Sequence, residues 1–234
     1  MKRRIKRVLT LATLPLYDRA KRVFCLSMQR TGTSSVGRFF RDFGFRWAGW
    51  PTSLRNQWSL AWYNGDYEAI FSSTDFRRTN AYEDSPWFCP GFYKILYHRF
   101  PEAKFVLFTR DPDDWFQSMM NHSGGNVLGR TDIHSKIYRR ESEYLAMLNA
   151  GLIDETEEDD PHGKREMKLW GHEAHYKSVY TLHHHEVVDY FGQHAPDALH
   201  VGTLEDADKW QKLGDFLGVP VPGHYESHEN ASAQ

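Results

Sequence analysis

The chain has 234 residues, of which 40% are hydrophobic and 26% are charged, as is ordinary for one globular domain. Its formal net charge of −2 argues against a protein that binds nucleic acid through bulk positive charge. Two cysteines, Cys25 and Cys89, are too few for a disulfide framework. A reducing, cytoplasmic location is therefore expected.

Residues 1–20 are expected to form a basic lead-in to a single domain that spans residues 21–234. The lead-in begins MKRRIKR, and Thr10, Thr13 and Pro15 interrupt the short apolar run that follows. No transmembrane segment is predicted, because no apolar run approaches the ~18 residues that a membrane span needs. Peripheral contact between the basic segment and a membrane surface is left open.

The first elements expected along the chain are a buried strand over residues 22–28, a polar loop over 29–35 and a helix. Apolar side chains recur at helical spacing from Val36 to Phe43, and Gly44 lies where a helix commonly ends. The following region is expected to contain short helices around residues 56–63 and 67–71. The first site-bearing unit is therefore strand, loop and helix.

The second half of the chain is expected to add two strands and several helices. The clearest strand covers residues 103–109, and a helix is expected after Pro112, with acidic residues in its first turn. The remaining elements are a loop over 121–130, a helix over 134–150, an acidic loop over 154–164, a long helix over 166–191, a strand over 198–201 and a helix over 208–217. This alternation predicts an α/β fold whose central sheet is mostly parallel and flanked by helices.

The first candidate site is the loop MQRTGTSS at residues 28–35, between the first strand and its helix. A helix N-terminus offers an anion free backbone N–H groups and a positive dipole end, and glycine lets the backbone approach closely. The residues expected to form this anion cradle are Arg30, Thr31, Gly32, Thr33, Ser34 and Ser35. A Ser/Thr-rich turn with a helix cap is the alternative.

The sequence lacks the ATP-type phosphate loop GxxxxGK[ST]. Arg165 follows Gly163 and Lys164, and no glycine precedes Gly163 at the required spacing. This argues against a kinase and favours a donor bound without a Walker lysine or Mg²⁺. No metal site is predicted, because His183, His184 and His185 would point in three directions from a helix.

The second candidate site follows the strand at residues 103–109, where Arg110 ends the strand and Ser118 lies eight residues later. Ligands of open α/β sheets bind at the carboxyl ends of the strands. An arginine offers a planar pair of donors to phosphate oxygens, and a serine adds a neutral donor. The alternative is an ion pair of Arg110 with Asp111 or Asp113.

Together the two motifs resemble those of sulfotransferases that use 3′-phosphoadenosine-5′-phosphosulfate (PAPS). Residues 29–34 match the family's 5′-phosphosulfate loop, with Gln29 in place of the usual proline. Arg110 and Ser118 match the residues that bind the 3′-phosphate, at the same spacing. The resemblance covers roughly residues 20–232 and extends to C-terminal segments of a largely microbial branch.

The resemblance implies a fold like that of P-loop NTPases and in-line transfer of a sulfuryl group from PAPS to a hydroxyl or amine. The acceptor would be a small molecule or a glycan, and no metal is expected. Arg30 would contact the oxygen that bridges sulfur and the 5′-phosphate. Two family features lack a clear counterpart: the catalytic histidine of cytosolic animal enzymes and their Arg-Lys-Gly loop, for which Lys164, Arg165 and Lys168 are weak substitutes.

The acceptor also needs a general base within hydrogen-bond reach. Asp84 is the first candidate because it lies between the two motifs, and Glu83 is its rival. A turn or helix-cap role is the alternative for Asp84. Three histidines are weaker candidates for the base: His122, His172 and His175.

Several alternatives accompany this interpretation. Trp58, Trp62 and Trp87 are candidates to stack on adenine, although core packing is expected for each. A small-molecule kinase with an unusual phosphate loop is the main competing function. A non-catalytic nucleotide-binding relative is the second.

Overall fold

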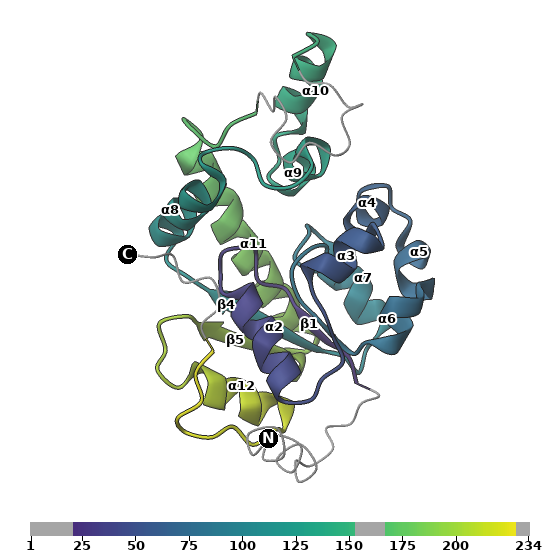
Figure 1. Cartoon of the computed structure of the whole chain (residues 1–234), viewed down its shortest axis with the longest axis vertical. Coiled ribbons are helices and arrows are strands. Elements are labelled where there is room, and N and C mark those ends of the chain that lie inside the picture. The colour runs from purple at the N-terminus through teal and green to yellow at the C-terminus, as the bar shows by residue number, and fades with distance from the viewer. Residues whose placement is uncertain (1–20, 153–166, 228–234) are drawn as a thin grey trace, which may run out of the picture.

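Five short parallel strands form the central sheet, in the order β2-β3-β1-β4-β5 (Figure 1). The structure is a computed structural model, and it describes residues 21–152 and 167–227. The strands are β1 (Val23–Cys25), β2 (Trp47–Ala48), β3 (Ala81–Tyr82), β4 (Lys104–Thr109) and β5 (Leu199–Thr203). Because all of them are parallel, their carboxyl ends meet at one edge of the sheet.

Helices cover both faces of the sheet, because successive apolar side chains of a strand point to opposite faces and both faces must be covered. On β1, Val23 and Cys25 point into one hydrophobic cluster, and Phe24 points into the other. The first cluster is covered by α2 (Thr33–Asp42) and α12 (Lys209–Leu217). The second is covered chiefly by α7 (Phe92–Arg99), α8 (Pro112–Ser123) and α11 (Glu173–His194). The expected α/β fold, with a parallel sheet between helices, is confirmed.

Four short helices fill the connection between β2 and β3. They are α3 (Trp50–Arg55), α4 (Trp58–Tyr63), α5 (Tyr67–Ser72) and α6 (Thr74–Arg78). The expected helices near residues 56–63 and 67–71 correspond to α4 and α5. The sequence did not reveal α3 or α6, nor did it reveal β2 and β3, because two-residue strands are too short to show a period.

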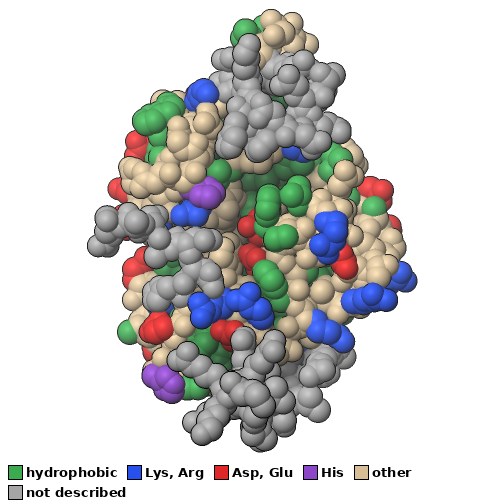
Figure 2. All heavy atoms as spheres, viewed as in Figure 1, with side chains coloured by type: hydrophobic (Ala, Val, Ile, Leu, Met, Phe, Trp, Pro, Cys, Tyr) green, Lys and Arg blue, Asp and Glu red, His purple; other side chains and the backbone are tan. Residues whose placement is uncertain are grey.

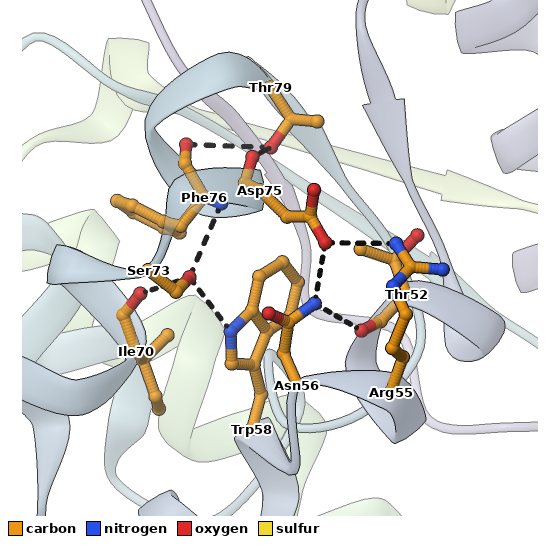
Figure 3. Close-up of polar contacts among 9 residues, drawn as sticks. All are labelled: Thr52, Arg55, Asn56, Trp58, Ile70, Ser73, Asp75, Phe76 and Thr79. Atoms are coloured by element: carbon orange, nitrogen blue, oxygen red, sulfur yellow. Dashed lines mark hydrogen bonds and ion pairs between the residues drawn. The ribbon is translucent and has the colours of Figure 1, made fainter.

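Polar contacts bind these short helices to one another (Figure 3). The Asp75 carboxylate on α6 accepts hydrogen bonds from Arg55 Nη2 at 2.8 Å and from Asn56 Nδ2 at 2.7 Å. The Trp58 indole N–H donates to Ser73 Oγ, the N-cap of α6, at 3.1 Å. The carboxyl end of α3 and the start of α4 are therefore fixed against α6.

The single helix expected over residues 134–150 is wrong. The structure has two helices there, α9 (Thr131–Ile137) and α10 (Glu141–Asn149), separated by Arg139 with φ 56°. The buried Arg140 guanidinium bonds bidentately to Glu143 at 2.7 and 2.5 Å, and it donates to the Lys168 carbonyl at 2.7 Å. These tertiary contacts fix the break between α9 and α10, and a helical pattern in the sequence does not indicate them.

The other elements lie close to their expected positions. The strands expected at 103–109 and 198–201 are β4 and β5, and a 3₁₀ turn (Pro196–Ala198) precedes β5. The long helix α11 begins at Glu173 rather than at residue 166, and Gly218 ends α12 with φ 70°. The lead-in at 1–20 and the acidic segment at 154–164 lie outside the described residues, so the domain division stays a prediction.

No helix within residues 21–152 and 167–227 is both long and apolar enough to cross a membrane.

Candidate active site

The two sequence motifs meet at one point of the sheet edge. The chain leaves β1 toward β2 on one side, and it leaves β4 toward β5 on the other, although β1 and β4 are neighbours. Open α/β sheets bind ligands in the crevice at such a reversal of connection. The loop of residues 28–35 follows β1 and Arg110 follows β4, so both motifs flank this crevice.

The start of α2 is arranged to receive an anion. Its N-cap is Gly32, which makes no side-chain cap, and no acidic residue lies in the first turn. The positive end of the helix dipole is therefore not neutralised by its own segment. Gly32 has φ 75°, and a Cβ there would lie 2.6 Å from Leu204 Cδ2, so both conformation and space favour glycine.

Arg30 lies within this loop and has an unusual backbone conformation. Its φ of 69° lies in the left-handed region, which costs a non-glycine residue about 1–3 kcal/mol and is often found at functional sites. The Trp115 indole N–H donates to the Gln29 carbonyl at 2.9 Å, and Gln29 Nε2 donates to Tyr138 Oη at 2.6 Å. These contacts hold Gln29, the residue that precedes Arg30.

The structure brings Arg30, Ser118 and Arg110 together. Arg30 Nε donates to Ser118 Oγ at 3.1 Å, which joins the first motif to the helix of the second. Partial burial, followed by the nearby charge of Arg110, lowers the pKa of Arg30. Two like charges close together are unfavourable, so the pair favours an anion between or beside them.

The alternative ion pair of Arg110 with Asp111 or Asp113 is wrong. Asp111 caps α8 by accepting from the backbone N–H groups of Asp113 and Asp114, and Asp113 pairs with Lys177. No carboxylate of residues 21–152 or 167–227 forms an ion pair with Arg30 or Arg110. Their charges are therefore left for a ligand.

Tyr180 fixes the backbone at Arg110, and no pattern in the sequence indicates this role. Its hydroxyl accepts from the Arg110 N–H at 2.9 Å and lies 3.2 Å from the Arg110 carbonyl. Its ring stacks on Trp115 with the centroids 4.3 Å apart. Trp115 thus supports both motifs, and its place inside the second motif is the only hint in the sequence.

Thr31 departs from its expected role as a donor to the anion. Its hydroxyl and its backbone N–H both donate to the Met28 carbonyl, the N–H at 3.2 Å, and the residue is fully buried. Thr31 therefore shapes the loop. Thr33 and Ser35 are also buried in the first turn of α2, and the Ser35 carbonyl accepts from Ser227 Oγ at 2.9 Å.

An acidic pair lies at the end of β3, on the other side of β1. Asp84 has φ 70°, so it shares the left-handed conformation of Arg30, and its Oδ1 accepts from the Ser85 N–H at 2.6 Å. Burial raises the pKa of Asp84. The Asp84 carbonyl also accepts a turn bond from the Trp87 N–H at 3.2 Å, so Asp84 has a turn role.

Glu83 is the more buried member of the pair, at 4% exposed. Burial and then the neighbouring Asp84 raise its pKa well above the usual range, while the Trp47 indole and the Thr33 hydroxyl act in the opposite direction. Within the described residues, its Oε2 makes no hydrogen bond, nor does Trp47 Nε1. Buried polar atoms are seldom left unpaired, so this corner is suited to a polar group.

Four of the histidines considered from the sequence serve the fold or the surface. His183 Nε2 contacts the Leu26 carbonyl at 2.8 Å, and His184 contacts the carbonyls of Tyr180 and Phe108. His175 Nε2 contacts the Tyr138 carbonyl at 2.7 Å, and His172 lies 3.9 Å from Glu143.

His122 differs from these four, because the charge of Arg30 acts on its imidazole ring. It lies one turn beyond Ser118 on α8. Burial and the charge of Arg30 lower its pKa. Across the described segments, no cluster of three or more His, Cys, Asp or Glu side chains could hold a metal ion.

The candidate adenine and 3′-phosphate contacts outside the two motifs are not supported. Trp58, Trp62 and Trp87 are only 1%, 3% and 0% exposed, so they pack in the core. Lys168 bonds to Asn126 Oδ1 at 2.7 Å on the surface. Lys164 and Arg165 lie outside the described residues.

Comparison with known proteins agrees with the geometry. The profile of a family described as sulfotransferase domain matches residues 22–234. A crystal structure of a sulfotransferase from Alicyclobacillus acidocaldarius has 16% sequence identity and a TM-score of 0.46, with 92% of this chain and 86% of that chain covered. No curated protein is significantly similar in sequence. The family match spans most of the chain, and the protein belongs to the sulfotransferase-domain family.

Proposed function

We propose that the protein transfers the sulfuryl group of PAPS to an acceptor hydroxyl or amine. One observation carries the proposal: Arg30, Arg110 and Ser118 meet at the switch point beside the uncapped start of α2. Neither guanidinium pairs with a carboxylate of the described residues. Such a site suits a ligand with two separate anionic groups, which PAPS has.

Each residue has a distinct role in this proposal. The first turn of α2, residues 33–35, holds the 5′-phosphate with backbone N–H groups and hydroxyls, aided by the close approach at Gly32. Arg110 and Ser118 bind the 3′-phosphate and so reject ATP, which lacks that group. Arg30 stabilises the charge that develops on the oxygen between phosphorus and sulfur, where a fixed cation helps the transition state most.

The donor supplies an activated sulfuryl group, which passes in line to the acceptor oxygen or nitrogen as the bond to the 5′-phosphate breaks. The acceptor loses its proton to a general base, and we assign this role to Asp84. It is partly exposed at the sheet edge, whereas Glu83 beside it is buried. Burial and the neighbouring Asp84 raise the pKa of Glu83 well above its usual value, which makes Glu83 the poorer candidate for a base.

Two other functions remain as alternatives. A small-molecule kinase would need Mg²⁺ and a lysine for the transferred phosphoryl group. The loop between β1 and α2 contains no lysine. A non-catalytic relative would bind the nucleotide without turnover.

The location expected from the two free, buried cysteines, Cys25 and Cys89, is cytoplasmic.

The test is calorimetric titration of the protein with 3′-phosphoadenosine-5′-phosphate (PAP), the product nucleotide, and separately with ATP and ADP, without added metal. We expect selective binding of PAP that is lost in Arg110→Ala. Arg99→Ala is the matched control, because Arg99 is an exposed arginine that pairs with Glu68. A preference for ATP when the titration is repeated with Mg²⁺ would replace this proposal with the kinase. PAP binding without sulfuryl transfer from PAPS to a panel of acceptors would favour the non-catalytic relative.

A further inference from the structure

Two buried aromatic side chains connect the loop after β1 with the residue that follows β4. Trp115 on α8 is 0% exposed, and Tyr180 on α11 is 2% exposed. Their rings stack with the centroids 4.3 Å apart and an angle of 19° between the planes. Each ring carries one polar group, and the two groups bond to different motifs. We call these two residues the aromatic pair.

The Trp115 member of the pair holds the peptide bond that leads into Arg30. Its indole N–H donates to the Gln29 carbonyl at 2.9 Å. That carbonyl and the Arg30 N–H belong to one planar peptide unit, so the bond fixes the direction in which the chain enters Arg30. The backbone of Arg30, with its φ of 69°, is thus tied to α8.

The Tyr180 member holds the backbone of Arg110. Its hydroxyl accepts from the Arg110 N–H at 2.9 Å and donates to the Arg110 carbonyl at 3.2 Å. The Tyr180 ring is fixed in turn by His184, whose ring centroid lies 4.2 Å away and whose Nε2 contacts the Phe108 carbonyl at 3.4 Å. Tyr180 is therefore anchored to β4, the strand that Arg110 follows.

The two arginines need such support, because their charges repel each other. Burial lowers the pKa of Arg30, and the nearby charge of Arg110 lowers it further. In Figure 2, Lys or Arg and His side chains lie on the surface where Figure 1 places α8 beside the loop after β1. Arg30 and Arg110 are half-buried, whereas the aromatic pair is buried. The pair therefore acts on the backbone of the site and leaves the charged groups open to a ligand.

We infer that Trp115 and Tyr180 are positioning residues that fix the spacing between the two proposed anion sites. Two phosphates on one nucleotide bind together only if the spacing of their sites matches the ligand. A spacing fixed before binding also saves the entropy of ordering the site. The aromatic pair thus strengthens binding of a bisphosphate such as PAP without strengthening binding of either monophosphate. This inference deepens the proposed function and rests on it.

The test is calorimetric titration of the full chain with PAP, with adenosine 5′-phosphate and adenosine 3′-phosphate measured by displacement of PAP. Tyr180→Phe removes one hydroxyl and keeps the stacked ring. We expect it to weaken PAP binding about fivefold, in line with one lost hydrogen bond, and to change the affinity of each monophosphate by less than about twofold.

Trp115→Phe should give the same pattern, because it removes the bond to the loop at the other end of the pair. The double variant should lose little more PAP affinity than either single variant, since each change already breaks the same connection. Tyr180→Phe decides the test even if Trp115→Phe does not fold.

Tyr176→Phe is the matched control for Tyr180→Phe. Tyr176 lies one turn earlier on α11 and is 0% exposed. Its hydroxyl accepts from Arg140 Nη1 at 2.7 Å and lies 2.8 Å from His134 Nε2, so it bonds to neither motif. This variant should lower the free energy of unfolding and bind PAP within about twofold of the wild type.

Trp58→Phe is the matched control for Trp115→Phe. Trp58 is 1% exposed, and its indole N–H donates to Ser73 Oγ at 3.1 Å among the short helices (Figure 3). It loses the same ring and the same kind of bond, far from both motifs in the chain. PAP affinity should again stay within about twofold of the wild type.

Failure of this inference differs from failure of the proposed function. The inference is overturned if PAP affinity is unchanged in Tyr180→Phe, or if the affinity of a monophosphate falls as much as that of PAP. In the second case each residue only shapes its own anion site. Fully additive losses in the double variant overturn it too, while the donor site stands. Absence of PAP binding to the wild type overturns the proposed function itself.

Discussion

The two halves of the sheet's carboxyl edge are built in different ways. On the β1–β4 side, cationic and hydroxyl side chains come from two motifs that each follow a strand directly, and they meet through the bond between Arg30 and Ser118. On the β2–β3 side, carboxyls, unpaired polar atoms and exposed apolar side chains come from two-residue strands and a one-turn helix. Phosphate binding needs local backbone geometry, whereas an acceptor needs a shape that many sequences can supply.

Removal of Arg30 should have the largest effect, because Arg30 is a central charged residue of the proposed donor site on the β1–β4 side. Arg30→Ala is expected to lower turnover by about 100- to 1,000-fold, the usual loss for one transition-state contact. Steady-state kinetics measures this, and circular dichroism checks the fold. Arg38→Ala is the control, because Arg38 lies on α2 with a 40% exposed side chain paired to Asp42. An active Arg30→Ala protein would refute the assignment.

Substitution of Glu83 or Asp84 tests the β2–β3 side of the sheet edge without changing the proposed donor site. Asp84→Asn should lower kcat by about 100-fold, as expected for loss of a general base, and leave PAP affinity unchanged. In the wild type, kcat should rise with pH through the pKa of Asp84, which burial places above its usual value. This acidic limb should vanish in Asp84→Asn.

Glu83→Gln is the matched comparison, because it keeps the shape of a side chain that we expect to be protonated. Its effect on kcat should be well below that of Asp84→Asn. If the two effects are reversed, Glu83 is the base.

Substitution of Gly32 tests the backbone at the start of α2, in the proposed donor site. Gly32→Ala should lower the free energy of unfolding by about 1–2 kcal/mol from the left-handed conformation alone, with a further loss from the 2.6 Å approach to Leu204. PAP affinity should fall as well. Denaturant titration and calorimetry measure the two effects.

Gly65→Ala is the matched control, because Gly65 has the same φ of 75° and no atom within 4 Å of its Cβ position. It should show only the conformational cost and unchanged PAP binding. Equal losses in both variants would show that contact with Leu204 is unimportant.

Removal of the Tyr138 hydroxyl should have the smallest effect, because it acts on Arg30 only through Gln29. Tyr138→Phe is expected to weaken PAP binding by about fivefold, in line with the loss of roughly one hydrogen bond of ~1 kcal/mol. Burial raises the pKa of Tyr138 well above its usual value, so the effect should be constant over the neutral pH range.

Tyr97→Phe serves as its control, since the Tyr97 hydroxyl makes one exposed bond, to the His194 carbonyl at 3.3 Å. If both variants bind PAP like the wild type, Gln29 does not need Tyr138 to place Arg30.

Prediction from the sequence was best where function depends on contiguous residues. The β1–loop–α2 unit and the Arg110–Ser118 spacing both lie where the sequence placed them, because strand length, glycine position and helical period are local properties. The bonds of the Thr31 hydroxyl and N–H to the Met28 carbonyl were not predicted, and the helix expected over 134–150 is interrupted before Arg140. Both differences arise from hydrogen bonds whose partners a linear pattern does not identify.

The sequence by itself determined the fold class, the family and the positions of the two motifs that we propose bind the donor. Only the tertiary structure decided that Arg110 is unpaired with its neighbouring aspartates, that Tyr180 and Trp115 hold the two motifs, and that Trp58, Trp62 and Trp87 are core. It alone placed Gly49, between β2 and α3, against the Glu83 carboxyl. The reason is physical: burial, charge proximity and hydrogen-bond partners depend on residues far apart in the chain, and only folding brings them together.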